Sequence, residues 1–454
     1  MILSNKSQEI GATPLKQRRL SFDRLCRTLI FHRLKNIPES ISLRDPWGNA
    51  ELGLGDTDAQ LEIIDPKFYR NALRQGSLGV AASWINHGWE TPNLTTLLRT
   101  FSRNTEVTDR FGQGISWLAS LLALRRHQRR ANTLAGSKKN IHDHYDLGND
   151  FFALILDDTM TYSSGLFKTK QTTLKEASIA KLDCICQMLE LQPKDHVIEV
   201  GCGWGSFAIH AAQHYGCRIT GVTISPEQHR LATQRVADAG LTGQVEFRLC
   251  DYRHVNGQFD KLASIEMIEA VGHSYLPLFF RKCSSLLLPG GKMALQAITL
   301  PNERYDQYLR GSDFIQQYIF PGGCLLSQDT IEKHVADHTD LIINDIKDIG
   351  IHYAETLRRW QKNFWEHEKE IRSLGYSEDF IRIWHYYFCY CEAGFDELYL
   401  GDLQILLTKS EPLQSLAYGN LRHNIRPRSA RKQICKSVMP TYIHPIRPAE
   451  NSDT

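Results

Sequence analysis

A glycine turn directly after a short apolar run constrains the fold of this 454-residue chain more than any other feature. The run is HVIEV, residues 196–200, and the turn is GCGWGS, residues 201–206. The segment that follows, FAIHAAQHY, has the spacing of a helix. A buried strand, a tight turn and a helix in this order open a parallel α/β sheet. Such a helix directs its free N–H groups toward a ligand above the turn.

Further short apolar runs follow the turn, with helical patterns between them. Strands that alternate with helices at this spacing predict a parallel α/β sheet. The runs that we expect to be strands are residues 218–224, 245–250, 261–267 and 292–298.

The spacing of the glycines indicates the cofactor. A dinucleotide-binding turn reads G-x-G-x-x-G, whereas Gly201, Gly203 and Gly205 read G-x-G-x-G and are preceded by Glu199. This is the usual form of the turn that binds S-adenosylmethionine in methyltransferases, and an acid here suits a ligand with an amino-acid ammonium and no pyrophosphate. The sequence therefore predicts an α/β fold, with a Rossmann-like class I S-adenosylmethionine methyltransferase domain.

Three polar residues at the ends of the next strands are further candidates for cofactor contacts. Thr223 and Gln228 lie in GVTISPEQ, where the second strand ends beside the ribose in this fold. Asp251 in LCDYR stands where an acid often meets the adenine amino group. Each signal is weak alone, but their order and spacing support the glycine turn.

The length of the chain predicts two domains, because a single core rarely grows this large. The net charge of +2 leaves attraction to anionic partners to local clusters. No apolar run approaches the roughly 18 residues of a membrane span, and the N-terminus lacks the apolar core of a signal peptide. The eleven scattered cysteines indicate a reducing compartment, and we expect no metal site.

We expect five parts in the chain. The N-terminal domain is a small α+β unit associated with lipid, and the basic C-terminal tail is expected to be disordered. The parts are a tail over 1–19, the small domain over 20–124, a basic linker over 125–140, the methyltransferase domain over 141–415 and the tail over 416–454.

The basic linker has two interpretations. It is either a solvated helix face or a surface for anionic phospholipid headgroups, where each cation contributes about 1 kcal/mol close to a charged membrane. The local cluster consists of Arg125, Arg126, Arg129, Arg130, Lys138 and Lys139.

Seven motifs in order resemble cyclopropane-fatty-acyl-phospholipid synthases and the related mycolic-acid methyltransferases, over about residues 20 to 410. In that family S-adenosylmethionine donates a methyl carbon to the cis double bond of an acyl chain in a membrane phospholipid. A bound bicarbonate then removes a proton and a cyclopropane ring closes. The motifs are HDHYDLGNDFF, MTYSSGLF, VIEVGCGWGS, GVTISPEQ, EMIEAVGH, SDFIQQYIFPGG and GIHYAETLRRW.

The resemblance also implies a location and partners. It implies a cytoplasmic enzyme that associates peripherally with the inner face of the membrane and takes an unsaturated phospholipid as substrate. Related synthases are often dimers, so a homodimer is one expectation, although nothing in the sequence fixes the oligomeric state. We expect no nucleic-acid partner, because no base-flipping signature or extended basic groove is evident.

The resemblance assigns two sets of site residues. The S-adenosylmethionine contacts are Tyr145, Tyr162, Ser163, Gly201, Gly203, Thr223, Gln228 and Asp251, to which Glu199 and Gly205 of the turn are added. The catalytic set, around bicarbonate, is Glu269, Tyr353, Ser164, Gln296 and the backbone at Ile298. Glu269 can hold the anion only through the anion's own proton, which orients a bare oxygen as base.

The expected chemistry places a carbocation on the acyl chain after methyl transfer. Such a cation needs a dry pocket, with aromatic faces that stabilise positive charge by about 0.5–2 kcal/mol each. The candidate aromatic residues are Tyr145, Tyr162, Tyr318, Phe320 and Tyr353.

Three departures from the bacterial synthases leave the product open. Ser164 stands where they usually have Cys, Gln296 where they usually have His, and Ala270 where a His commonly follows the glutamate. A weaker or absent bicarbonate would lengthen the life of the cation and favour a methyl- or methylene-branched chain. Two other classes remain as alternatives: an N- or O-methyltransferase of a small polar acceptor such as phosphoethanolamine, and a lipid-binding protein without catalysis.

Overall fold

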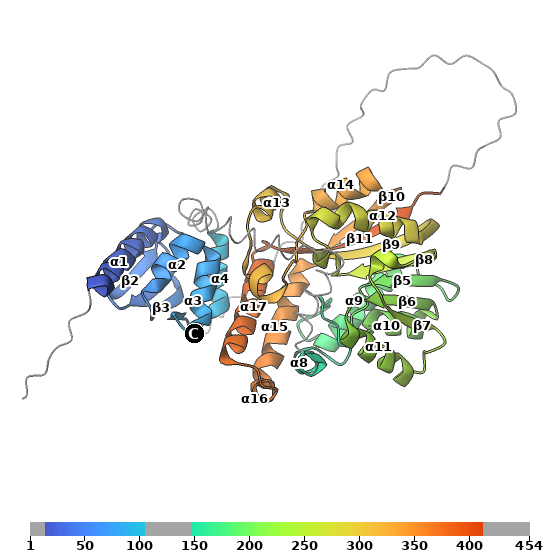
Figure 1. The fold of residues 1–454 in the computed structure, drawn as a ribbon, viewed down its shortest axis with the longest axis horizontal. Coiled ribbons are helices and arrows are strands. Elements are labelled where there is room, and N and C mark those ends of the chain that lie inside the picture. Colours follow the sequence, from blue (N-terminus) through green and yellow to red (C-terminus); the bar gives the residue numbers. More distant parts are fainter. Residues whose placement is uncertain (1–13, 105–147, 412–454) are drawn as a thin grey trace, which may run out of the picture. The chain divides into compact units, whose positions relative to one another are not determined.

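The computed structural model describes residues 14–104 and 148–411 (Figure 1). These described residues form one compact unit. Residues 1–13 of the expected N-terminal tail, the basic linker with its cation cluster, Tyr145 and all of the expected C-terminal tail lie outside the described residues. Residues 14–19 of the expected N-terminal tail are helical. Within them, no helix combines the length and the apolar character needed to cross a membrane.

Residues 14–104 form a small α+β unit, as the sequence predicts. Four strands pair in the order β2-β1-β3-β4, in which β1 is antiparallel to β2 and parallel to β3. In β1 the side chains of Ile41 and Leu43 are buried in one core with those of the helices. The elements are α1 (Pro14–Leu34), β1 (Ser40–Asp45), β2 (Gly48–Gly53), β3 (Thr57–Ile63), α2 (Lys67–Gln75), α3 (Ser77–Ile85), β4 (Trp89–Glu90) and α4 (Leu94–Arg103).

A seven-stranded sheet in the order β10-β11-β9-β8-β5-β6-β7 forms the centre of the remaining chain. The neighbours from β7 to β9 are parallel, which confirms the predicted α/β class, and the buried central strands are covered on both faces. The strands are β5 (His196–Val200), β6 (Arg218–Thr223), β7 (Val245–Leu249), β8 (Phe259–Ile265), β9 (Leu287–Thr299), β10 (Leu341–Asp348) and β11 (Gly401–Lys409).

Two strands of this sheet, β10 and β11, are not among those that the sequence pattern predicts. β11 runs antiparallel to both of its neighbours, β9 and β10. It enters the sheet about a hundred residues after β9, beyond a long helical segment, so local periodicity gives no sign of its partner. Its register brings Gln404 opposite Gln296 and Asp402 opposite Ile298, which adds two polar side chains to a predicted site.

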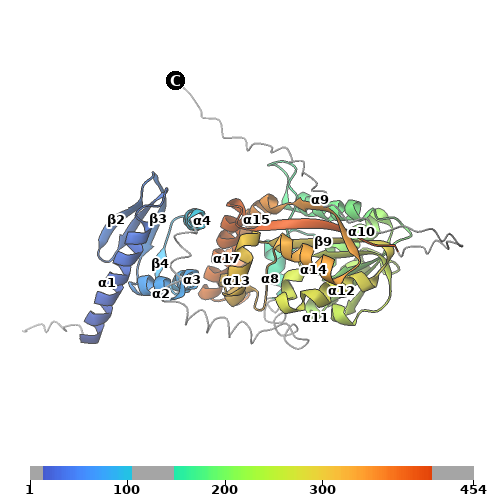
Figure 2. The same ribbon diagram turned by 90° about the horizontal axis from the view of Figure 1, so that it is seen from above.

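Helices cover both faces of the sheet. Figure 2 shows α9 and α10 on one side of it and α12 and α14 on the other. Each group shares a separate apolar core with the strands, built around Phe207 on one face and Phe279 on the other. The helices are α9 (Leu174–Leu189), α10 (Ser206–Tyr215), α11 (Pro226–Asp238), α12 (Leu276–Leu286) and α14 (Gln328–His338).

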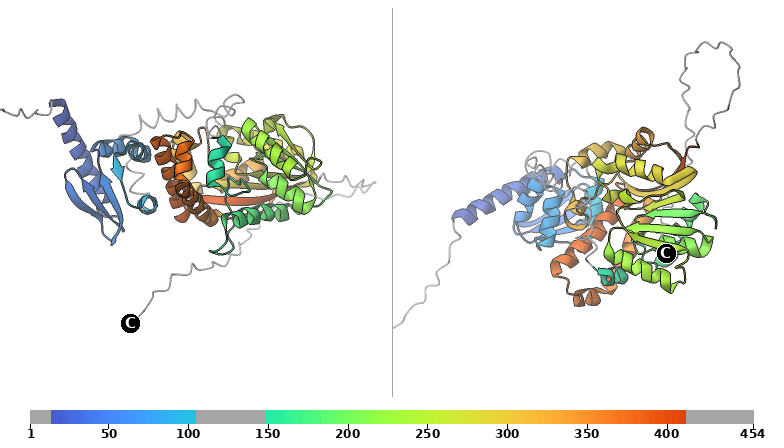
Figure 3. Two further views of the ribbon diagram at one scale, coloured as in Figure 1. Left: turned by 90° about the horizontal axis from the view of Figure 1, so that it is seen from below. Right: turned by 45° about the vertical axis from the view of Figure 1, so that its right-hand side comes forward.

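The aromatic-rich segments build a helical layer beside the sheet. The long helices α15 and α17 pack side by side (Figures 1 and 3). Trp360 of α15 is fully buried, and full burial of a large apolar side chain contributes about 1.5–3 kcal/mol. The elements are α8 (Gly148–Ile155), α13 (Asn302–Leu309), the π-helical turn Ile315–Ile319, α15 (Gly350–Glu366), α16 (Glu368–Ser373) and α17 (Glu378–Asp396).

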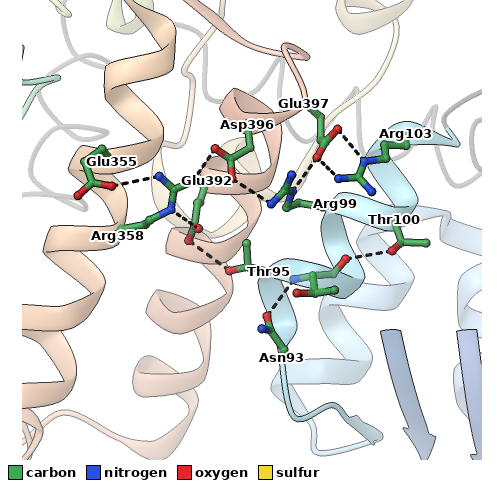
Figure 4. A network of polar contacts seen from close by, with 11 residues as sticks. Asn93, Thr95, Arg99, Thr100, Arg103, Glu355, Arg358, Glu392, Asp396 and Glu397 are labelled. Atoms are coloured by element: carbon green, nitrogen blue, oxygen red, sulfur yellow. Dashed lines mark hydrogen bonds and ion pairs between the residues drawn. The ribbon is translucent and has the colours of Figure 1, made fainter. Parts of the chain in front are cut away.

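Charged side chains join α4 to this helical layer (Figure 4). Glu397 accepts hydrogen bonds from Arg99 Nε at 2.6 Å and from Arg103 Nε at 2.8 Å. Thr95 Oγ1 donates to Glu392 at 3.2 Å, and Arg358 pairs with the same carboxylate. The network is partly shielded from water, so it contributes more than isolated surface pairs would.

Candidate active site

The glycine turn lies between β5 and α10, as predicted. Gly201 has a φ of +87°, and a Cβ atom there would lie 2.4 Å from Met267 Cγ. Gly205 is the left-handed N-cap of α10. Both positions therefore require glycine, and the backbone between them lines a large cavity with the N-terminus of α10 close by.

Glu199 precedes the turn on β5 and is 3% exposed. Its Oε2 atom is buried and has no hydrogen-bond partner among the described residues. Burial raises the pKa of Glu199 well above its usual range, while the Lys181 cation opposes this shift. A buried acceptor without a partner is costly, and Glu199 lines the cavity, so the residues present fit a ligand that carries ammonium or hydroxyl donors, as S-adenosylmethionine does.

The polar residues predicted at the next strand ends also line the cavity. Thr223 Oγ1 donates to Gln228 Oε1 at 2.8 Å, which fixes both side chains at the end of β6. Asp251 accepts hydrogen bonds from Arg253 Nε at 2.8 Å and from an Arg253 terminal nitrogen at 2.6 Å. Although burial raises it, these bonds bring the pKa of Asp251 below its usual value, so the group stays an acceptor.

Tyr162 and Ser163 also line the cavity. The Tyr162 hydroxyl donates to the Tyr387 hydroxyl at 3.2 Å. Ser163 Oγ accepts a hydrogen bond from Lys181 Nζ at 2.6 Å. Of the predicted cofactor contacts that the structure describes, only Gly205 does not line the cavity, so the structure brings this set together around one space. Their contacts with a cofactor stay a prediction.

Lys181 is a site residue that the sequence analysis missed. It is 1% exposed on α9, a helix that begins at a capping box formed by Thr173 and Glu176. Burial lowers the pKa of Lys181, and four carboxylates, led by Glu266, oppose this shift. One signal was available: Lys181 lies four residues from both Ala177 and Ile185, on the apolar face of the helix.

Three residues of the predicted catalytic set converge on the Glu266 carboxylate. Ser164 N donates to Glu266 Oε1 at 2.9 Å, and Gln296 Nε2 donates to the same oxygen at 2.7 Å. The Tyr353 hydroxyl donates to Glu266 Oε2 at 2.6 Å. The Ser164 hydroxyl donates elsewhere, to the Gly165 carbonyl at 3.1 Å. The expected role of the Ser164 side chain at an anion is therefore not what the contacts show, because the backbone N–H faces this position.

The other two residues of that set form a second contact. Ile298 N donates to Glu269 Oε1 at 2.6 Å, and Glu269 Oε2 is buried without a partner among the described residues. Burial and the nearby Glu266 carboxylate raise the pKa of Glu269 to about 8. Glu269 therefore holds its proton more tightly than an exposed glutamate does.

Strand β11 anchors the Gln296 side chain from behind. Gln296 Nε2 also donates to Asp402 Oδ2 at 2.8 Å, and Gln404 Nε2 donates to Gln296 Oε1 at 3.1 Å. All three side chains are 0% exposed. A buried amide with its donors and acceptor engaged has one fixed orientation, so Gln296 is held toward Glu266.

These contacts decide whether the predicted bicarbonate fits. The donors from Ser164, Gln296 and Tyr353 bond to Glu266, and the N–H of Ile298 bonds to Glu269. Ser164 and Gln296 do not line the cavity, whereas Glu266 does. The expected residues are brought together, but as they stand they do not fit a separate bicarbonate ion.

The cavity itself has a volume of about 950 Å³. Beside the glycine turn its walls include Tyr162, Phe320 and Tyr353, three of the aromatic residues predicted for a dry pocket. Tyr318 does not line it and is 39% exposed, so that expectation was wrong for Tyr318. Apolar side chains of the small α+β unit extend the wall; they include Ile30, Leu34, Leu43, Leu61, Phe68 and Leu98.

Comparison with known proteins identifies the family. A family model described as mycolic acid cyclopropane synthetase matches residues 133–405. The chain is 39% identical over 350 residues to tuberculostearic acid methyltransferase UfaA1 of Mycobacterium tuberculosis, covering 76% of this chain and 81% of that protein. It is 33% identical over 345 residues to the cyclopropane-fatty-acyl-phospholipid synthase of Escherichia coli, covering 75% and 85%.

A solved structure agrees with these matches. The mycolic acid cyclopropane synthase CmaA1, complexed with SAH and CTAB, aligns with a TM-score of 0.57 at 30% identity, covering 60% of this chain and 98% of that one. S-adenosylmethionine is the methyl donor in the family. The chain therefore belongs to the mycolic acid cyclopropane synthetase family and is an S-adenosylmethionine-dependent methyltransferase of lipid metabolism.

Proposed function

We propose that this enzyme transfers a methyl group to the cis double bond of an unsaturated acyl chain in a membrane phospholipid, and that proton loss then closes a cyclopropane ring. The observation that carries the proposal is one cavity of about 950 Å³ whose lining includes the glycine turn, aromatic side chains and three glutamates, Glu199, Glu266 and Glu269. S-adenosylmethionine bound at the turn would supply the electrophilic methyl group.

The residues of this chain contribute alignment and exclusion of water. An alkene is a poor nucleophile, so its π bond must be held in line with the methyl group, and such alignment can remove several kcal/mol of barrier. Tyr353 stacks on Phe395 with ring centroids 4.5 Å apart, and both line the cavity. Aromatic faces stabilise a nearby cation, and a dry wall keeps water from capturing it.

A small polar acceptor fits this cavity less well. Many of the lining side chains outside the glycine turn are aliphatic or aromatic, and several of these belong to the small α+β unit. An N- or O-methyltransferase would need a polar pocket for its acceptor. An acyl chain matches the apolar wall, which supports a lipid substrate over phosphoethanolamine and similar compounds.

Methylene or methyl branching of the same acyl chain is the second candidate product. The similarity to tuberculostearic acid methyltransferase favours it, together with Ser164, Gln296 and Ala270 in place of the residues usual in bacterial synthases. Both products begin with the same methyl transfer. Ring closure then needs only loss of a proton from the transferred carbon. A methylene branch needs a hydride shift before the proton is lost, and a saturated methyl branch needs a later reduction as well.

The test is product analysis with the purified enzyme, S-adenosylmethionine and vesicles of a monounsaturated phosphatidylglycerol. Mass spectrometry is expected to show lipid enlarged by one CH₂ unit, and proton NMR is expected to show the upfield signals of a cyclopropane. Vinylidene or branched-methyl signals without ring protons would replace the first candidate by the second. Unchanged lipid, with methylation of a small amine instead, would overturn both.

Membrane association and the oligomeric state belong to the proposal as well. We infer peripheral binding to an anionic bilayer surface through the predicted basic linker, which lies outside the described residues. Vesicle flotation is expected to fall as salt rises and to fall further after charge reversal at Arg129 and Arg130. Binding that does not depend on salt would count against this route, and sedimentation would test a homodimer.

A further inference from the structure

The side chain at position 266 uses the donors that sequence similarity assigns to an external anion. Glu266 accepts hydrogen bonds from the backbone N–H of Ser164, the amide of Gln296 and the hydroxyl of Tyr353, at 2.9, 2.7 and 2.6 Å. A planar carboxylate presents the same kind of acceptor oxygens as a bicarbonate ion. The structure therefore contains a carboxylate of its own where the anion was expected.

The backbone at this position is unusual and firmly held. Glu266 has a φ of +48°, in the left-handed region that favours glycine over a long side chain. Its N–H donates to the Gln296 carbonyl at 2.9 Å, directly after β8 ends. The same neighbour thus holds both the backbone and the carboxylate, and the left-handed turn directs the side chain back toward the donors.

Glu266 reaches the cavity, and two of its three donors do not. Glu266 and Tyr353 line the cavity, whereas Ser164 and Gln296 do not. The cation of Lys181, which is buried on α9, attracts the Glu266 carboxylate. The Glu269 carboxyl is also close enough to Glu266 for the two groups to interact electrostatically. Glu266 and Tyr353 are therefore open to an acyl chain in the cavity, whereas the donors of Ser164 and Gln296 are not.

We propose that Glu266 is the general base of the reaction and does within the chain what bicarbonate does in related synthases; this inference rests on the proposed function. In the first step the π electrons of the alkene bond to the methyl carbon as its bond to sulfur breaks. This leaves neutral S-adenosylhomocysteine and a cation on the adjacent acyl carbon.

The second step uses the carboxylate. Glu266 takes a proton from the transferred carbon, and the electron pair of that C–H bond closes the ring. If the product is a methylene branch, a 1,2-hydride shift first moves the cation to the carbon that bears the new methyl group, and the electron pair of the C–H bond then forms the C=C bond. Glu266 becomes a neutral carboxylic acid and the positive charge on the lipid is gone. Atoms and charge balance without any further reactant.

Two substitutions test the base. Glu266→Gln keeps the size of the side chain and removes its basicity, and it is expected to lower product formation by about 10²-fold or more. Glu266→Gly removes the side chain at a backbone position that glycine favours, so this variant is expected to fold and to expose the three donors. Glu332→Gln, an exposed carboxylate on α14, is the matched control and is expected to keep full activity.

Bicarbonate is the probe that distinguishes the two bases. In buffer depleted of carbon dioxide, the wild type is expected to keep its rate and Glu266→Gly to be nearly inactive. Added bicarbonate is expected to restore part of the Glu266→Gly rate with saturation, and to leave the wild type unchanged. A wild type that needs bicarbonate, or a Glu266→Gln variant within a few fold of wild type, overturns the inference.

A binding measurement is independent of turnover. Carbon-13 NMR of labelled bicarbonate is expected to show broadening with Glu266→Gly and none with wild type, and thermal unfolding with S-adenosylhomocysteine checks that both are folded. Binding to the wild type in competition with Glu266 overturns the inference. If the wild type does not methylate phospholipid, the proposed function fails, while the binding result still decides whether Glu266 excludes the anion.

Discussion

Two carboxylates in the cavity wall, Glu199 and Glu266, differ in how their oxygens are satisfied. At the glycine turn, Glu199 keeps one carboxylate oxygen without a partner among the described residues. Both oxygens of Glu266, in contrast, accept hydrogen bonds from within the chain. A buried acceptor without a partner indicates a place for a ligand, whereas a satisfied one indicates a group that the protein supplies itself. The comparison separates the part of the site that binds from the part that reacts.

Removal of the buried cation is expected to have the largest effect on this arrangement. Lys181→Met leaves the carboxylates around it uncompensated, and loss of one partner of a buried ion pair typically costs about 3–5 kcal/mol. Urea unfolding at pH 7 would measure the change in the free energy of unfolding. Lys175→Met, on the same helix but exposed, is the control and is expected to leave the midpoint unchanged. Equal effects of the two substitutions would contradict the role given to Lys181.

At the glycine turn, Gly201→Ala is expected to weaken the binding of the cofactor. The added Cβ would lie 2.4 Å from Met267 Cγ in a left-handed backbone, and overpacking of this kind costs about 1–3 kcal/mol. Calorimetry with S-adenosylmethionine is expected to show affinity lower by about 10–100-fold. Gly240→Ala, also left-handed but with nothing within 4 Å of its Cβ, provides the control. Unchanged affinity in Gly201→Ala would mean that the turn does not hold the cofactor.

The raised pKa of Glu269 is expected to make the free energy of unfolding depend on pH. Its pKa of about 8 in the folded chain lies above the ordinary value of 4.5, so the folded state binds the proton more tightly than the unfolded state. The free energy of unfolding is therefore expected to fall as pH rises between 4.5 and 8, by up to about 1.4 kcal/mol per pH unit from this group. Denaturant titrations of the wild type and Glu269→Gln at pH 6 and 8 would measure it, and the variant is expected to have the flatter dependence.

The smallest effect is expected from Ser164→Cys. The Ser164 side chain bonds to the Gly165 carbonyl, and only its backbone N–H reaches Glu266. Stability is expected to change by less than about 1 kcal/mol, because the swap is nearly isosteric. Lipid NMR is expected to show the same product ratio as the wild type. A change in the ratio of branched to cyclic product would show that the Ser164 side chain influences which product forms.

Much of the fold follows from the sequence because its signals are local. The run 196–200, the glycine turn and the helix after it are consecutive, and the next strands repeat the same alternation with helices. The position of β11 does not follow, because an antiparallel partner for β9 comes from about a hundred residues further along the chain. Asp402 and Gln404 therefore enter the site only when the sheet is seen.

The reactive residues, too, could be predicted only in part from the sequence. The motif EMIEAVGH contains two glutamates, and the resemblance selects Glu269 for the anion. The left-handed backbone at Glu266 brings this glutamate, and not Glu269, to the donors of Ser164, Gln296 and Tyr353. The residue types around position 266 do not predict this backbone conformation. Lys181 is hidden for a related reason, since lysine within a helical pattern is ordinarily solvated.

The most direct test of the account is turnover of deuterated S-adenosyl-[methyl-D₃]methionine with monounsaturated phospholipid in buffer depleted of bicarbonate. The account predicts lipid in which the transferred carbon has lost one deuteron, formed at a rate that added bicarbonate does not change. Retention of all three deuterons, or product that forms only when bicarbonate is added, would contradict the claim that Glu266 removes the proton.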